Sequence, residues 1–178
     1  LVNIEDYTTH ASPNYRLILQ LGQQKALSRG IPLIIVESDV VVKKDTIKSL
    51  ISISEAYSNP GMVAAVTVNE NNEYNFPYTF VKEKNNNVVI SKHRLSFSCT
   101  ILTLSLLKKI NFENLPKTKD WFDVYLSHQS KKYGFVNILA KNLEVFHSPH
   151  SSRPWKKLKY ERPVLYYIQK YLKQRDRI

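Results

Sequence analysis

The stretch IPLIIVESD, residues 31–39, decides the fold that the sequence predicts. Residues 31–36 form a short apolar, largely β-branched run without polar alternation, which is typical of a strand covered on both faces. A strand of this kind belongs to the interior of an α/β sheet. Ligands of open α/β sheets bind beyond the carboxyl ends of the strands, so Glu37 and Asp39, which follow directly, mark a candidate site.

The segments around this strand predict two helices and a second strand. Ser12 as N-cap, Pro13 in the first turn and Gly30 at the end favour a helix over residues 13–29. Another helix is expected to begin after Asp45 and to end at the Asn-Pro-Gly turn of residues 59–61, with a strand over 62–68 behind it. This strand–helix–strand unit predicts two neighbouring parallel strands joined by a right-handed crossover.

The rest of the chain also alternates between strand and helix. Alternating residues on both sides of an asparagine-rich turn predict a hairpin at a sheet edge. Together these segments predict a mixed, mostly parallel α/β sheet flanked by helices. The remaining expected elements are hairpin strands over 78–83 and 88–91, a strand over 97–102, helices over 103–110 and 120–133, and strands over 135–139 and 143–147.

The composition is that of one ordinary globular domain. The chain has 178 residues, of which 43% are hydrophobic, enough for a core without cross-links. Its single cysteine, Cys99, allows no internal disulfide and is expected to be an inert buried thiol in a reducing cytosolic setting. No Cys/His cluster has zinc-site spacing, and no GxxxxGK[ST], GxGxxG or GxSxG motif occurs. P-loop, dinucleotide-binding and serine hydrolase chemistry is therefore not supported.

The net charge of +11 is concentrated in the C-terminal segment. Residues 151–178 contain nine Lys/Arg and two acidic residues, interleaved with Trp155 and four tyrosines. Such a segment can bind phosphates, nucleic acid or an anionic lipid surface, or it can be a solvated terminal helix. We therefore treat residues 1–150 as the candidate catalytic domain and residues 151–178 as a basic aromatic helix or tail.

Glu37 and Asp39 carry the chemistry of the predicted site. If the chain stays extended after the strand, residues two apart point to the same side, so both carboxylates can bind one hard cation while Ser38 points away. Such a cation can bind a nucleotide diphosphate and neutralise the charge of a leaving group. The alternative is that the two acids only end the strand in solvent.

Three segments, in this order, resemble the family-two glycosyltransferases of the GT-A fold. The first is IPLIIVESDVVVKKDTIKSLI, residues 31–51, which is similar to the family's DxD-type motif after an apolar strand. Glu37 departs from the strict pattern in the first acidic place, whereas Asp39 matches it. The resemblance implies that Asp39 and Glu37 bind the metal ion and, through it, the nucleotide.

The second segment is KDWFDVYLSHQSKKYGF, residues 119–135, which resembles the family's acidic segment at the start of a helix. Asp123 matches the general base, although Phe122 replaces the usual preceding glutamate. Asp120, three residues earlier and on nearly the same helical face, is the rival. Such a carboxylate takes the proton of the acceptor hydroxyl as the new anomeric bond forms. From position alone, Asp120 can equally be an N-cap and Asp123 a favourable charge in the first turn.

The third segment is KNLEVFHSPH, residues 141–150, which resembles the strand and histidine that end the catalytic domain of the family. His147 matches the residue that completes the metal or diphosphate site, and His150 is the fallback. The expected cofactor is Mn²⁺ or Mg²⁺. Imidazole together with carboxylates suits Mn²⁺ better than Mg²⁺. Apart from the resemblance, a lone histidine after a strand is an ordinary polar cap.

Smaller features lie between these segments. Arg94, Ser96 and Ser98 stand where the family places residues near donor and acceptor, but a half-buried strand with alternating serines accounts for them equally. Trp121 can stack on a sugar ring or belong to the core.

The resemblance implies an inverting glycosyltransferase of surface polysaccharide or glycan synthesis. Its partners would be a nucleotide-sugar donor and a glycan or lipid-linked acceptor; nucleic acid is not expected. A cytoplasmic protein is implied, with peripheral contact to the inner face of the membrane through the basic C-terminus. The family's first nucleotide-binding strand has no counterpart at the start of the sequence, which predicts truncation at the front. The alternatives are a nucleotidyltransferase-like sugar-nucleotide enzyme and a non-catalytic module that binds nucleic acid or anionic lipid.

Overall fold

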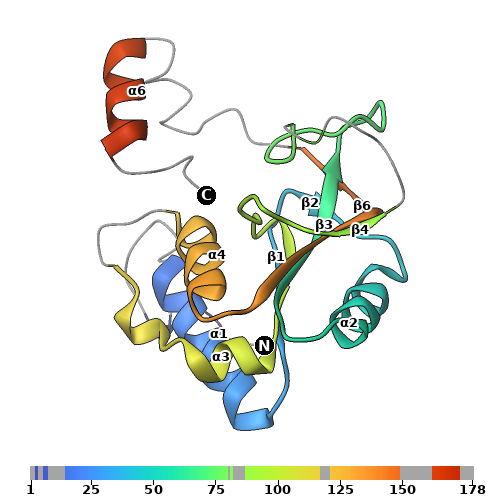
Figure 1. The fold of residues 1–178 in the computed structure, drawn as a ribbon, viewed down its shortest axis with the longest axis vertical. Coiled ribbons are helices and arrows are strands. Elements are labelled where there is room, and N and C mark those ends of the chain that lie inside the picture. The colour runs from blue at the N-terminus through green and yellow to red at the C-terminus, as the bar shows by residue number, and fades with distance from the viewer. Residues whose placement is uncertain are drawn as a thin grey trace.

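The computed structural model describes residues 3, 6–7, 15–79, 81, 87–116, 121–148 and 162–172. A mixed sheet runs through this part of the chain, with helices on both faces (Figure 1). The helices are α1 (Tyr15–Arg29), α2 (Thr46–Ala56), α3 (Leu104–Lys109), the short 3₁₀ helix η2 (Phe112–Asn114), α4 (Phe122–Lys132) and α6 (Pro163–Leu172). The strands are β1 (Leu33–Val36), β2 (Val40–Val41), β3 (Pro60–Val68), β4 (Val88–Ile90), β5 (Cys99–Leu102) and β6 (Val136–His147).

The sheet is mostly antiparallel, so the prediction of a mostly parallel sheet is wrong. Its order is β1-β5-β3-β6-β2, with β4 also paired to β6, and among the described strands only β3 and β6 pair in parallel. The predicted parallel pairing of β1 with β3 does not form, because β5 lies between them and runs antiparallel to both. Local sequence gave no sign of this insertion, since β5 is as fully buried as β3.

Three strands nevertheless run in one direction. β1 and β3 are each antiparallel to β5, and β6 is parallel to β3, so β1, β3 and β6 all end at the same edge of the sheet. The segment that follows β1 leads into β2, which pairs with the end of β6, so the two segments lie side by side although about a hundred positions separate them in the sequence. This shared edge positions the candidate site.

The predicted hairpin and the two predicted C-terminal strands also need correction. β4 forms within the predicted range 88–91, but it pairs with β6, and the described residues of the range 78–83 are not in a strand. The predicted strands 135–139 and 143–147 are one strand, β6. Its pairing with β3 shifts register after Ala65↔Ala140, so that Val66 faces Glu144. The polar Lys141-Asn142 pair thus marks an irregularity inside a strand.

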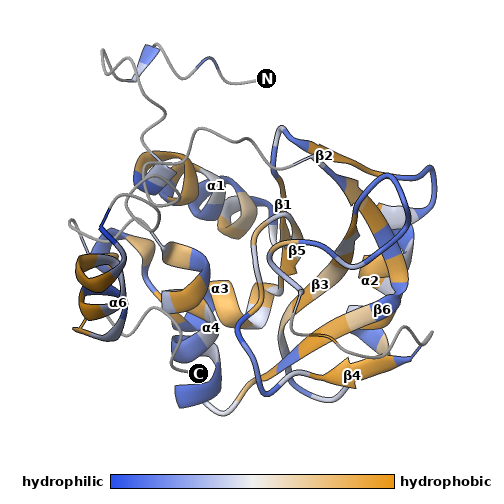
Figure 2. Cartoon of the chain, turned by 90° about the horizontal axis from the view of Figure 1, so that it is seen from above, coloured by the Kyte–Doolittle hydropathy of each residue, from blue (hydrophilic) through white to orange (hydrophobic). Residues whose placement is uncertain are grey.

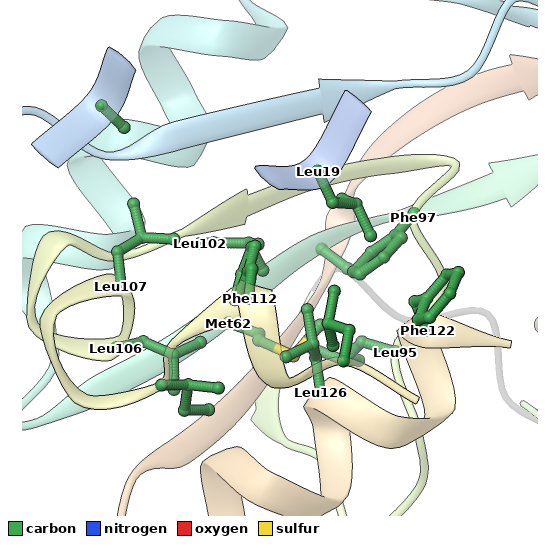
Figure 3. Close-up of a cluster of buried hydrophobic side chains, with 14 of the residues drawn as sticks. Leu19, Met62, Leu95, Phe97, Leu102, Leu106, Leu107, Phe112, Phe122 and Leu126 are labelled. Carbon is green, nitrogen blue, oxygen red and sulfur yellow. The ribbon is translucent and has the colours of Figure 1, made fainter. Parts of the chain in front are cut away.

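Two hydrophobic clusters fill the two faces of the sheet. β3 contributes Met62, Ala64 and Val66 to one face and Val63 and Ala65 to the other, which is the alternation expected of a strand buried on both sides. Figure 3 shows the first cluster, in which α1, α3 and α4 cover the sheet through Leu19, Leu106, Leu107, Phe122 and Leu126. The second cluster lies under α2.

The helix ends follow the sequence signals closely. Gly30 and Gly134, which come just after α1 and the end of α4, have φ angles of +65° and +80°, where residues with a side chain are strained. Gly61 has a different role: a Cβ there would stand 2.1 Å from Ser130 Oγ and 2.8 Å from Phe135 Cβ. β3 therefore enters the sheet in close contact with the segment that follows α4.

No helix in the described part of the chain has the length and apolar character needed to cross a bilayer. The terminal helix α6 lies at the rim of the molecule, away from the sheet (Figure 1).

Candidate metal centre

The chain turns directly after β1. Residues 37–39 do not stay extended: the amide of Val40 donates to the carbonyl of Glu37 at 3.1 Å, which closes a tight turn around Ser38 and Asp39. Ser38 is exposed, whereas Glu37 and Asp39 are half-buried. The turn thus produces the arrangement that was expected from an extended chain, with two carboxylates inward and the serine outward.

His147 reaches this turn from the end of β6. β2, which follows the turn, pairs with β6 in the register Val40↔His147, and the amide of Ser148 donates to the carbonyl of Asp39 at 3.0 Å. The histidine side chain is 1% exposed. A residue that the sequence placed 108 positions beyond Asp39 is therefore held beside it by backbone pairing.

The imidazole of His147 has a defined orientation. Its Nδ1 lies 2.7 Å from the carbonyl oxygen of Phe76, an acceptor, so Nδ1 carries the proton of this hydrogen bond. In the neutral ring Nε2 then presents its lone pair. Nε2 is buried, has no hydrogen-bond partner, and lies 3.4 Å from Asp39 Oδ2. Two acceptors so close repel each other unless a positive charge stands between them.

Glu37 completes the cluster. One ligand atom from each of Glu37, Asp39 and His147 lies within 4.8 Å of the others. This donor set fits Mn²⁺, since a neutral imidazole and two carboxylates combine one nitrogen with hard oxygen ligands. An Nδ1–H that donates to a backbone carbonyl is also the usual support of a metal-bound histidine. The three residues that the sequence assigned to a metal thus lie together.

Polar side chains around the cluster fix its members. Ser98 Oγ donates to Glu37 Oε2 at 3.0 Å, and the hydroxyls of Ser96 and Ser98 are hydrogen-bonded at 3.0 Å. On the other side, Asn75 Nδ2 donates to the carbonyl of His147 at 2.7 Å. Sequence reasoning missed Asn75 and Phe76, because an asparagine and a backbone carbonyl in an asparagine-rich loop carry no recognisable motif.

Asp123 lies at the start of α4, in the first turn as the sequence predicted. Its Oδ2 is 3.2 Å from Arg94 Nη1, and its Oδ1 accepts a hydrogen bond from the amide of Val124 at 2.8 Å. The Arg94 guanidinium also lies 5.6 Å from the centre of the Trp121 ring. The N-cap position is occupied by Trp121, so the reading of Asp120 as the N-cap is wrong. Asp120 and His150 themselves lie outside the described residues.

The segment before β5 connects the two groups of acids. Arg94 pairs with Asp123, while Ser98, four residues on, binds Glu37. Between them the amide of Ser96 donates to the hydroxyl of Tyr78 at 3.0 Å. Burial raises the pKa of the Tyr78 phenol well above its usual range, so this hydroxyl is neutral and structural. A single buried segment therefore supports both candidate catalytic groups.

Cys99, the first residue of β5, is not part of this chemistry. It is fully buried, and burial raises the pKa of its thiol to about 11. A thiol that stays protonated is a poor nucleophile, which agrees with the expected inert role.

Comparison with models of known protein families gave no match, and comparison with curated proteins gave none either.

Proposed function

We propose that this chain is a metal-dependent glycosyltransferase that transfers a sugar from a nucleotide-sugar donor to a hydroxyl acceptor with inversion. The observation that carries the proposal is the convergence of Glu37, Asp39 and His147 at one edge of the sheet. These residues come from two distant segments, each of which resembles a segment of the family-two glycosyltransferases. One ligand atom from each residue lies within 4.8 Å of the others.

The local electrostatics support a bound cation at this cluster. Two acids face a buried imidazole nitrogen that lacks a hydrogen-bond partner. In a buried setting such an arrangement is costly without a compensating positive charge. A divalent ion held by these residues would neutralise charge on the departing nucleotide diphosphate. The side chains of Asp39 and His147 are 5% and 0% exposed and would hold the ion together with Glu37, which is half-buried.

Asp123 is the proposed general base. Its pairing with Arg94 and the Val124 amide favours the ionised form, which is the form that accepts a proton. The side chain remains 18% exposed, so an acceptor hydroxyl can approach it. The hydrogen bonds also fix its direction, as positioning in catalysis requires. Arg94 is then a positioning residue that holds the base.

A binding experiment tests the proposal. Isothermal titration calorimetry with the full chain would measure the binding of uridine, guanosine and adenosine diphosphates with Mn²⁺ and with EDTA. We expect one diphosphate to bind in Mn²⁺ and not in EDTA. Asp39→Asn should abolish this binding, because it removes a buried ligand of the ion. Asp45→Asn is the matched control, since Asp45 is exposed, six residues on, and makes no side-chain capping bond.

The outcomes separate the levels of the proposal. Binding of Mn²⁺ without any nucleoside diphosphate would retain the metal site and exclude the transferase. Failure to bind Mn²⁺ would exclude both. A nucleotidyltransferase is distinguished by its products, because it releases pyrophosphate from a nucleoside triphosphate, whereas a glycosyltransferase releases a nucleoside diphosphate from a nucleotide sugar.

A further inference from the structure

The terminal helix α6 has one apolar face. At 100° per residue, six of its side chains fall within an arc of about 160°, and Tyr166, Gln169 and Lys170 lie opposite. The helix is about 15 Å long at 1.5 Å per residue. The hydrophobic residues of α6 appear orange in Figure 2. The face consists of Val164, Leu165, Tyr167, Ile168, Tyr171 and Leu172.

This face points away from the protein. All six of its residues are exposed, with Val164 and Leu172 each at 72%, whereas Tyr166, Gln169 and Lys170 on the polar side are half-buried. No side chain of α6 is buried, and α6 contributes to neither hydrophobic cluster. A surface helix normally turns its apolar stripe toward the core. In α6 the orientation is reversed, so the apolar face is available to something outside the chain.

The charge of the sequence that contains α6 indicates what kind of surface the apolar face contacts. The segment 151–178 contains nine Lys/Arg and two acidic residues, a net charge of +7 from nine minus two. Lys170 extends over the rings of Tyr166 and Tyr167, with Nζ 5.9 Å and 5.7 Å from their centres. Tyrosines beside an apolar helix face, with basic residues around them, are typical of helices that lie in the headgroup region of an anionic bilayer.

We propose that α6 docks this chain on an anionic lipid surface, with its apolar face inserted at the headgroup boundary and its basic flanks against the lipid phosphates. A protein partner fits the observations less well, because a strong positive charge next to a short apolar face needs an extended negative surface to complement both. A bilayer supplies both at once. The inference does not depend on the proposed transferase, since none of its residues belongs to the metal centre.

Vesicle flotation with the full chain tests this docking. The probes are vesicles of phosphatidylcholine alone and vesicles in which part of it is replaced by phosphatidylglycerol. We expect the protein to float with the anionic vesicles and not with the neutral ones, and high salt to release it. Ile168→Ser should weaken binding roughly tenfold, because it removes an inserted aliphatic side chain.

Matched variants separate insertion from charge. Gln169→Ser introduces the same residue on the polar side of the same helix and should leave binding unchanged within about twofold. Arg162→Gln, at the exposed residue before the helix, should weaken binding roughly fivefold at low salt. Circular dichroism in the presence of vesicles would establish that each variant keeps its helix.

Three results would overturn the proposal. The first is failure of the parent chain to float with anionic vesicles. The second is equal binding by the parent and Ile168→Ser, which would show attraction by charge without insertion. The third is a parent chain that does not bind vesicles but self-associates in sedimentation velocity, with the self-association lost in Ile168→Ser. That result would assign the face to a second copy of the chain.

Discussion

The two acidic groups near the sheet edge differ in how their charge is balanced. Asp123 is paired with Arg94 at 3.2 Å and accepts a backbone hydrogen bond, so the fold itself compensates its charge. At the other group, Asp39 faces an imidazole nitrogen at 3.4 Å that has no hydrogen-bond partner, and Glu37 stands beside them. Under the proposed function, this difference separates a carboxylate that would act as a base from carboxylates that would bind a cation.

Removing the carboxylate of Asp123 should have the largest effect on activity. Asp123→Asn is expected to lower kcat by roughly 100- to 10,000-fold, the usual contribution of a general base, while Mn²⁺ affinity stays unchanged. Steady-state release of nucleoside diphosphate from the donor sugar in the presence of acceptor would measure this. Glu55→Gln, at an exposed acid on α2, serves as the control. Full activity in Asp123→Asn would exclude this residue as the base and leave Asp120 as the candidate.

The cluster of Glu37, Asp39 and His147 should respond differently, through metal binding. His147→Ala removes the buried nitrogen ligand, and we expect the Mn²⁺ dissociation constant to rise on the order of 100-fold. The constant for Mg²⁺ should rise less, because that ion prefers oxygen ligands. Calorimetric titration with each ion would give both values, with exposed His93→Ala as control. An unchanged Mn²⁺ constant in a variant that still unfolds cooperatively would remove His147 from the site.

Removing a side chain that only supports a ligand should weaken Mn²⁺ binding less than removing a ligand. Ser98→Ala removes the hydrogen bond to Glu37 Oε2, and loss of such an outer partner commonly weakens metal binding 10- to 100-fold. Because Glu37 is also half-buried, we expect the lower end, about tenfold. The same Mn²⁺ titration measures the change, and Ser52→Ala on the exposed side of α2 provides the control. A loss as large as that of His147→Ala would mean that Ser98 acts directly on the ion.

The sequence predicted the position of the metal cluster better than the sheet that carries it. A buried apolar run followed by acids is a local signal, and Glu37 and Asp39 do follow β1. Their inward orientation was predicted for the wrong reason, since it comes from a turn closed by the Val40 amide. The outcome was the same because both arrangements leave Ser38 outside.

The order of the strands could not be predicted from local sequence patterns. β5 inserts between β1 and β3, and an apolar strand buried on both faces has the same pattern whether its neighbours are parallel or antiparallel. The Arg94–Asp123 pair likewise depends on the chain reversing between β4 and α4, which no residue pattern specifies. β1, β3 and β6 nevertheless share one direction, and the pairing of β2 with β6 then brings His147 to Asp39.

The smallest expected effects are on the free energy of unfolding without metal. Substitutions in the two acidic groups should change it with opposite signs. In EDTA, Asp39→Asn should raise the free energy of unfolding by about 1 kcal/mol. The new amide can donate a hydrogen bond to the lone pair of His147 Nε2, where the carboxylate only repels it. Asp123→Asn should instead lower that free energy by a similar amount, because it breaks a largely buried ion pair with Arg94.

Urea denaturation followed by circular dichroism would measure both signs, and Mn²⁺ should reverse the first by stabilising the parent chain alone. Destabilisation by Asp39→Asn in EDTA would mean that a proton already bridges Asp39 and His147, and that the parent cluster is balanced without a metal. The sign of this one change therefore decides between a structural histidine–aspartate pair and a site in which function has been retained at the expense of stability.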